Sequence, residues 1–218
     1  MSTDAPTAET VRRVRRKAAR PSEIVAAALS VFAERGFAAT RLEEVAARAG
    51  ISKGTVYLYF DTKEALFEAV VRQELLPVLA RLEALVDAHE GKAADLLRCV
   101  AMRFEAVLES ELGGIPKLVL AESGNFPAIA KFYDEEVVAR GVRLFSRILE
   151  RGVVGGEFRP LPARQLIPVF VGPILLMLLW KHSVGRHAVF GFDAPAVLQT
   201  HLDIVLRGLA PDKTEALP

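Results

Sequence analysis

Residues 42–60 read LEEVAARAGISKGTVYLYF, and this stretch decides the fold of the first part of the chain. Its apolar and small residues recur at helical spacing up to Ala49. Gly50 permits a sharp turn, because glycine accepts backbone angles that other residues avoid. Ser52 is a good N-cap for a second, short helix that runs through Tyr57. A helix, a tight glycine turn and a second short helix predict a helix-turn-helix.

The flanking sequence predicts a helix on either side of this pair. A preceding helix begins near Pro21 and ends at Gly36, which suits a left-handed C-cap. Thr40 and Glu43 have the spacing of a capping box for the next helix. A fourth helix starts near Asp61, and we expect Pro77 to kink it because the apolar pattern resumes beyond the proline.

The remaining sequence predicts further helices and no strands. Glycine and proline separate apolar helical segments near residues 93–112, 116–124, 127–152, 161–184 and 193–208. Hydrophobic residues form 51% of the 218 residues, which is ample for a core. We therefore predict an all-α protein with three parts: a disordered basic arm over 1–20, a DNA-binding domain over 21–67, and a helical body over 68–218.

The short helix that begins after Ser52 is the candidate for reading DNA. Its leading residues are Lys53, Gly54 and Thr55, which are small or basic and suit an approach to phosphates and base edges. Tyr57 and Tyr59 follow with hydroxyls. Outside this helix, Lys63 lies in the first turn of the next one, where free amides favour an anion.

The stretch Ile24–Val71 resembles the DNA-binding domain of TetR/AcrR-family regulators. The residues that carry the resemblance are Phe32, Gly36-Phe37, Thr40, Val45-Ala46, Ala49-Gly50, Ser52 to Phe60 and Lys63-Glu64. The resemblance implies that Thr40 contacts a phosphate, that Lys53, Gly54 and Thr55 read the groove, and that Tyr57, Tyr59 and Lys63 bind the duplex. It also implies packing roles for Val56 and Phe60. The rest of the chain matches that family only in helical character.

A basic segment precedes the helix-turn-helix. The formal net charge of the chain is only +1, so this local cluster is the notable electrostatic feature. Its members are Arg12, Arg13, Arg15, Arg16, Lys17 and Arg20. Such an arm enters the minor groove in some DNA-binding proteins, and a nonspecific or solubilising tail is the alternative.

The last two predicted helices are candidates for a homodimer interface. One helix-turn-helix contacts few base pairs, and a two-fold partner doubles that number. Leu166–Trp180 is apolar nearly all round, which is more than a single exposed helix should be. The resemblance implies the same arrangement. The expected interface residues are Leu175, Leu179, Val197, Leu198, Leu202, Val205 and Leu206.

Other apolar positions of the body are candidates for an effector pocket, although ordinary core packing is the alternative for most of them. Glu122 stands out because a carboxylate is disfavoured near a helix C-terminus; a surface salt bridge is the alternative to a ligand anchor. The expected lining is Phe104, Leu108, Leu118, Glu122, Phe126, Phe145, Phe170, Ile174 and Met177.

We expect no enzyme, metal or cofactor. The four histidines are scattered, and His182 and His187 are badly spaced for two ligands on one helix face. The single cysteine, Cys99, cannot form an internal disulfide, which favours the cytoplasm. The apolar run 166–180 is shorter than a membrane span and contains Pro168 and Pro173. A secretory signal is not apparent at the N-terminus.

These observations together predict a homodimeric, cytoplasmic transcription regulator. We expect a repressor that leaves a palindromic operator when a small, largely apolar effector binds the body. A DNA-binding regulator that needs no ligand is the alternative, and a helical enzyme is a weaker one.

Overall fold

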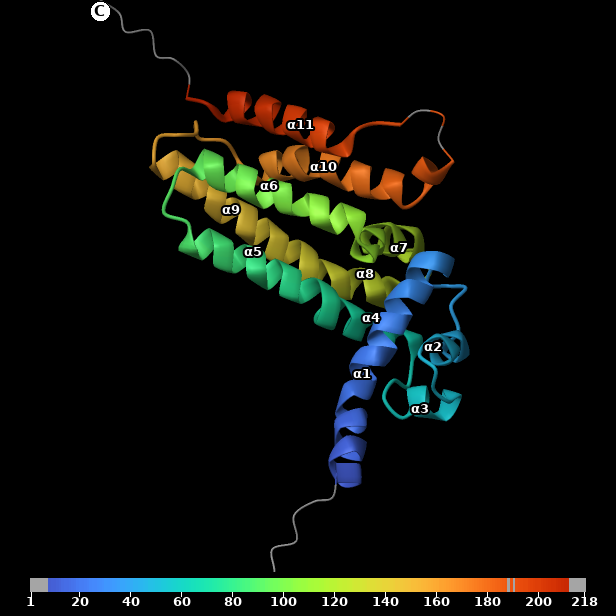
Figure 1. Ribbon diagram of the computed structural model, residues 1–218. Coiled ribbons are helices and arrows are strands. Elements are labelled where there is room, and N and C mark those ends of the chain that lie inside the picture. Colours follow the sequence, from blue (N-terminus) through green and yellow to red (C-terminus); the bar gives the residue numbers. More distant parts are fainter. Residues whose placement is uncertain (1–7, 188, 190, 212–218) are drawn as a thin grey trace, which may run out of the picture. The chain divides into compact units, whose positions relative to one another are not determined.

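The computed structural model describes residues 8–187, 189 and 191–211, and this part of the chain is helical, without strands (Figure 1). The prediction of an all-α protein is confirmed. Two compact units divide at Gln73 and Glu74, a few residues beyond the expected boundary after residue 67. Each unit has its own core and is described separately.

The first unit contains four helices around an aromatic cluster. They are α1 (Ala8–Arg35), α2 (Leu42–Arg48), α3 (Lys53–Tyr57) and α4 (Lys63–Val70). The rings of Phe32, Phe37 and Phe67 meet with centroids 5.5–6.1 Å apart. All three rings are buried, so one side chain from α1, one from the following turn and one from α4 form the core that ties α1 to α4.

The turns of this unit form where the sequence predicts them. Gly36 and Gly50 have positive φ values of 81° and 65°, which only glycine adopts readily. Ser52 caps α3 by accepting a hydrogen bond from the Thr55 amide at 3.2 Å. Thr62 caps α4 in the same way through the Ala65 amide at 3.0 Å.

Two expectations for this unit differ from the structure. The helix α1 begins at Ala8, whereas we expected disorder over 1–20 and a helix start near Pro21. Alanine, arginine, lysine and glutamate favour helix, and they dominate this segment. The expected Thr40–Glu43 capping box is also wrong: Arg41 is the N-cap of α2, and Glu44 accepts its backbone amide at 3.3 Å.

A π-helical segment, η1 (Val71–Leu75), joins α4 to α5 (Leu76–Ala88). Pro77 lies at the start of α5, and helical structure continues beyond the proline as predicted; the kink itself stays a prediction. Proline lacks a backbone donor, and a wider π turn before it accommodates the missing hydrogen bond.

The second unit is a bundle built from α5 and the helices that follow. They are α6 (Ala93–Glu109), α7 (Ile115–Glu122), α8 (Pro127–Tyr133), α9 (Ala139–Val154), α10 (Ala163–Lys181) and α11 (Ala194–Leu209). A π segment, η3 (Asp134–Val138), joins α8 to α9. Short 3₁₀ turns, η2 (Glu111–Gly114) and η4 (Val184–Arg186), follow α6 and α10.

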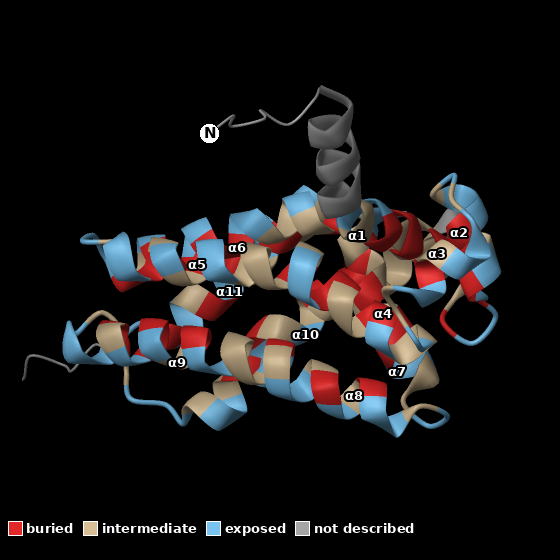
Figure 2. Ribbon diagram, turned by 90° about the horizontal axis from the view of Figure 1, so that it is seen from below, coloured by how far each residue is buried: buried red, intermediate tan, exposed pale blue. Residues whose placement is uncertain are grey.

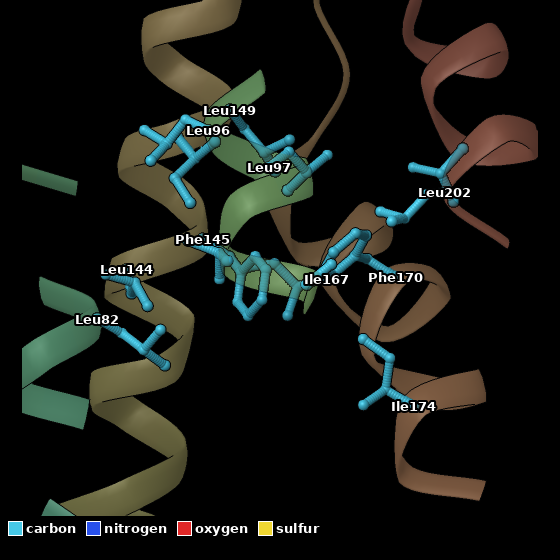
Figure 3. Packing of buried hydrophobic residues seen from close by; sticks show 14 of the residues in the cluster. Leu82, Leu96, Leu97, Leu144, Phe145, Leu149, Ile167, Phe170, Ile174 and Leu202 are labelled. Carbon is cyan, nitrogen blue, oxygen red and sulfur yellow. The ribbon is translucent and has the colours of Figure 1, made fainter. Parts of the chain in front are cut away.

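Apolar stripes of α5, α6, α9, α10 and α11 meet in the core of this bundle. Figure 3 shows Phe145 of α9 beside Ile167 and Phe170 of α10; the two phenyl centroids are 4.7 Å apart. Buried and exposed residues alternate along α5 and α9 in Figure 2, as amphipathic helices require. The start of α6 is capped by a residue of another segment. Glu157, in the loop after α9, accepts hydrogen bonds from the Ala93 and Ala94 amides at 2.8 and 3.2 Å.

The helix α10 is unusual in its apolar surface. An 18-residue window of it has a mean hydropathy of 1.7, so by length and composition alone it is apolar enough to cross a membrane. It contains Pro168 and Pro173 and packs against α6, α7, α9 and α11. Only 28% of that window is buried inside the chain, so much of its apolar surface faces outward.

Candidate nucleic-acid interface

The helix α3 presents one continuous outward face. Val56 is fully buried and anchors the helix to the unit. Lys53, Gly54, Tyr57 and Leu58 are exposed. At about 100° per residue, Gly54 and Leu58 lie opposite Val56, and Lys53 and Tyr57 lie on the flank between them. The predicted outward projection of the leading residues of α3 is therefore present in the structure.

Lys53 is held in place by an acidic neighbour on α2. Its Nζ lies 2.5 Å from Oε1 of Glu43 and 5.5 Å from the centre of the Tyr57 ring. The hydrogen bond with Lys53 lowers the pKa of the Glu43 carboxyl, and the same bond raises the pKa of Lys53. Both side chains are exposed, so a phosphate is able to replace Glu43 as the partner of Lys53.

Gly54 leaves the middle of this face open. A Cβ atom at Gly54 would meet only Oγ of Ser52, at 4.0 Å. The fold of the unit therefore does not require glycine here. A large partner that approaches the backbone closely is the remaining steric reason for glycine at this position.

The other predicted contacts on this segment are partly covered. The Thr55 hydroxyl lies 2.8 Å from Oγ of Ser52, within the cap of α3. Thr55 and Tyr59 are half-buried, whereas Tyr57 is 40% exposed. Tyr57 is thus better placed than Thr55 to reach a duplex.

Thr40 and Lys63 both hold the turn between α1 and α2. Thr40 is buried, its hydroxyl donates to the Gly36 carbonyl at 2.6 Å, and its amide donates to the Phe37 carbonyl at 3.2 Å. Nζ of Lys63 donates to the Ala38 carbonyl at 2.9 Å and lies 4.5 Å from the centre of the Phe37 ring. Both residues therefore stabilise this turn, and their expected contacts with phosphate stay a prediction.

Leu58 is a surface residue that our sequence prediction did not consider. It is 74% exposed directly after α3. The signal that would have found it is its spacing of four residues from Gly54, which places both on one helix face.

Comparisons with known proteins agree with this geometry. A sequence profile described as "Bacterial regulatory proteins, tetR family" matches residues 24–70. The chain is 44% identical over 198 residues to the HTH-type transcriptional regulator RutR of Escherichia coli K12, a match that covers 86% of this chain and 82% of that relative. This chain belongs to the TetR family. A second relative of this TetR-family regulator is the HTH-type transcriptional repressor KstR2 of Rhodococcus jostii RHA1, 29% identical over 196 residues, or 89% of this chain and 93% of the relative.

Solved structures of TetR-type regulators have the same fold. The regulator FadR from Bacillus subtilis, solved in complex with stearoyl-CoA, superposes with a TM-score of 0.74 at 22% identity over 86% of this chain and 98% of FadR. The ketosteroid transcriptional regulator KstR2 of Mycobacterium tuberculosis gives a TM-score of 0.62 at 25% identity, over 88% of this chain and 98% of that chain.

The residues predicted to line one effector pocket lie in three places of the second unit. Phe104, Leu108, Ile174 and Met177 line one small cavity between α6, α10 and α11. Phe145 and Phe170 line another, between α6, α9, α10 and α11. Leu118, Glu122 and Phe126 belong to α7 and the residues after it, and they line neither cavity. Each cavity measures about 10 Å³, which is room for about one water molecule.

The residues predicted to form the dimer interface divide into two groups. Leu198, Leu202 and Val205 are buried inside the single chain, so their assignment to the surface is wrong. They are the inward stripe of α11, which packs on α6 and α10. The others, which remain half-buried, are Leu175, Leu179, Val197 and Leu206.

In the described part of the chain, no group of three or more histidine, cysteine, aspartate or glutamate side chains is arranged to hold a metal ion. His89, His182 and His201 instead contact backbone carbonyls at 2.8–3.3 Å.

Proposed function

We propose that this TetR-family regulator represses transcription as a homodimer on a palindromic operator and leaves it when a small, largely apolar effector binds. The observation that carries the DNA-binding half of the proposal is the outward face of α3, where Lys53, Gly54 and Tyr57 are exposed while Val56 is buried. A short helix anchored on one side and basic on the other fits the major groove.

The dimer proposal rests on unburied apolar surface. Val169 and Leu176 on α10 are 59% and 61% exposed, and Ile204 on α11 is 66% exposed. Apolar surface of this kind on two adjacent helices marks an interaction site. We therefore move the proposed interface to these outward residues, flanked by the half-buried Leu175, Leu179 and Val197; Leu206 lies on the inward side of α11, against the core.

The effector proposal rests on the lining of the second unit. The two small cavities are lined almost entirely by apolar side chains; Glu105 is the one charged residue among them. FadR was solved with stearoyl-CoA and KstR2 is described as a ketosteroid regulator, which supports an effector with a large apolar part, an acyl chain or a fused-ring system. Cavities of this size must widen to admit such a molecule, so binding would favour a different packing of the helices and could weaken DNA binding by linkage.

The basic segment is proposed to add nonspecific affinity for DNA. Because α1 extends back to Ala8, Arg12, Arg16 and Arg20 fall at positions i, i+4 and i+8 of a helix. A cluster of basic residues beside the duplex would steepen the dependence of affinity on salt.

A binding assay tests the operator and the effector separately. The full-length protein would select duplexes from a randomised DNA library, and the enriched duplex would then be titrated with stearoyl-CoA and a ketosteroid. We expect enrichment of an inverted repeat, and release of the protein by an apolar probe at concentrations that leave a nonspecific duplex unaffected. Enrichment with no release by any apolar probe would favour the ligand-independent regulator. A failure to enrich any sequence would contradict the proposed function.

Gly54→Ala should separate folding from DNA binding. The free protein has room for the added methyl group, and alanine favours helix over glycine by about 0.5–1 kcal/mol, so the free energy of unfolding should rise slightly. The same methyl group should block close approach of the duplex and lower operator affinity about tenfold. Chemical denaturation and fluorescence anisotropy measure the two effects. Unchanged affinity would remove Gly54 from the proposed contact face.

A further inference from the structure

The exposed large hydrophobic side chains of the first unit gather at one place. Within residues 20–73, whose exposure the structure describes, the exposed large hydrophobic side chains are Tyr57, which is 40% exposed, and Leu58, which is 74% exposed. The other large apolar side chains of this stretch are buried or half-buried in the aromatic core and between the helices. An isolated exposed leucine needs no explanation, but an adjacent pair on the face proposed to meet DNA does.

The position of Leu58 on this face is specific. It follows Gly54 by four residues and therefore lies beside it on the helix surface. Because Gly54 has no side chain, a duplex that approaches there comes close to the backbone, and Leu58 stands next to that gap. The carboxylate near this face, Glu43, is paired with Lys53.

The major groove offers a leucine one kind of favourable partner. Base edges there carry hydrogen-bond donors and acceptors, and the apolar group among them is the C5 methyl of thymine. A leucine against polar edges would gain nothing and would displace their water. Against a thymine methyl it would bury apolar surface on both sides.

We propose that Leu58 determines specificity by packing on a thymine methyl group in each operator half-site. This inference rests on the proposed function, because it requires that α3 enter the major groove. It adds a base preference, thymine rather than cytosine, at the position that faces the C-terminal end of α3.

The test replaces thymine by deoxyuridine, which lacks only the methyl group. Starting from the duplex enriched by the full-length protein, each thymine of one half-site would be replaced in turn. For the unchanged protein we expect one position at which affinity falls about fourfold, the effect of one buried methyl group. Leu58→Ala should bind the thymine and deoxyuridine duplexes equally well at that position. Tyr57→Phe is the matched control, and it should keep the fourfold ratio even if its overall affinity falls.

Three results would overturn the inference. One is the absence of any methyl-sensitive position, and another is an unchanged thymine-to-deoxyuridine ratio in Leu58→Ala. The third is a change in the oligomeric mass of Leu58→Ala, because Leu58 would then serve a contact between copies of the chain. The first two results presuppose an enriched operator and the third is measured without DNA, so all three are distinguishable from failure of the proposed function, in which no sequence is enriched.

Discussion

The double substitution Leu176→Glu and Ile204→Glu should convert the protein to a monomer and lower its affinity for a full operator at least a hundredfold. Both side chains are more than 60% exposed on adjacent helices, so the single chain should tolerate the change. Two charges on each copy would instead be buried unpaired in a two-fold interface, at a cost of several kcal/mol. A monomer contacts one half-site only and loses the combined binding energy of the pair. Analytical ultracentrifugation and gel shifts measure the two effects.

Leu120→Glu is the control for this experiment. Leu120 is 56% exposed on α7 and is not among the proposed interface residues, so the same chemical change should leave the mass and the operator affinity as they are. If the α10–α11 variant remained a dimer with normal affinity, the outward apolar surface of these helices would need another explanation.

Gly152→Ala should lower the free energy of unfolding by about 2–3 kcal/mol, as overpacked cores do. A Cβ atom at Gly152 would lie 2.0 Å from Cδ2 and 2.4 Å from Cε2 of the Phe158 ring. The ring has little freedom to move away, because it is buried and because the Phe158 amide donates to the Gly152 carbonyl at 3.0 Å. Thermal and chemical denaturation of the second unit would report the loss.

Gly141→Ala in the same helix is the matched control. No atom lies within 4 Å of a Cβ built at Gly141, so the substitution should only improve helix propensity and raise the free energy of unfolding by about 0.5–1 kcal/mol. Similar effects of the two substitutions would show that the close contact between Gly152 and Phe158 is unimportant for stability.

The first unit was largely predictable because its signals are local. Gly36, Gly50 and Ser52 each act through their own backbone or through an amide a few residues away, and each forms the turn or cap that the sequence predicts. Thr40 was misassigned for a related reason. The Thr40 hydroxyl can accept from the Glu43 amide, as the capping box requires, or donate to the Gly36 carbonyl. The structure has the second bond, which depends on how the preceding turn is closed.

Contacts between distant segments were not predictable from such signals. The hydrogen bond from Lys63 to the Ala38 carbonyl links residues far apart in sequence, and Glu157 caps α6 from the loop after α9. Neither pair has a spacing that a helix or a turn would reveal. The expected single effector pocket stays a prediction, but part of its lining is divided, since Phe104 and Phe145 line different cavities.

The sequence alone determined that this chain is helical, where its helix-turn-helix lies, and which residues lead α3, because caps, glycine turns and apolar periodicity act over a few residues. Only the tertiary structure decided which side of α10 and α11 faces inward. Both helices carry more apolar residues than one stripe needs, so periodicity cannot tell Leu202, which is buried in the core, from Ile204, which is exposed. Packing against α6 makes that choice, and it involves residues about a hundred positions away.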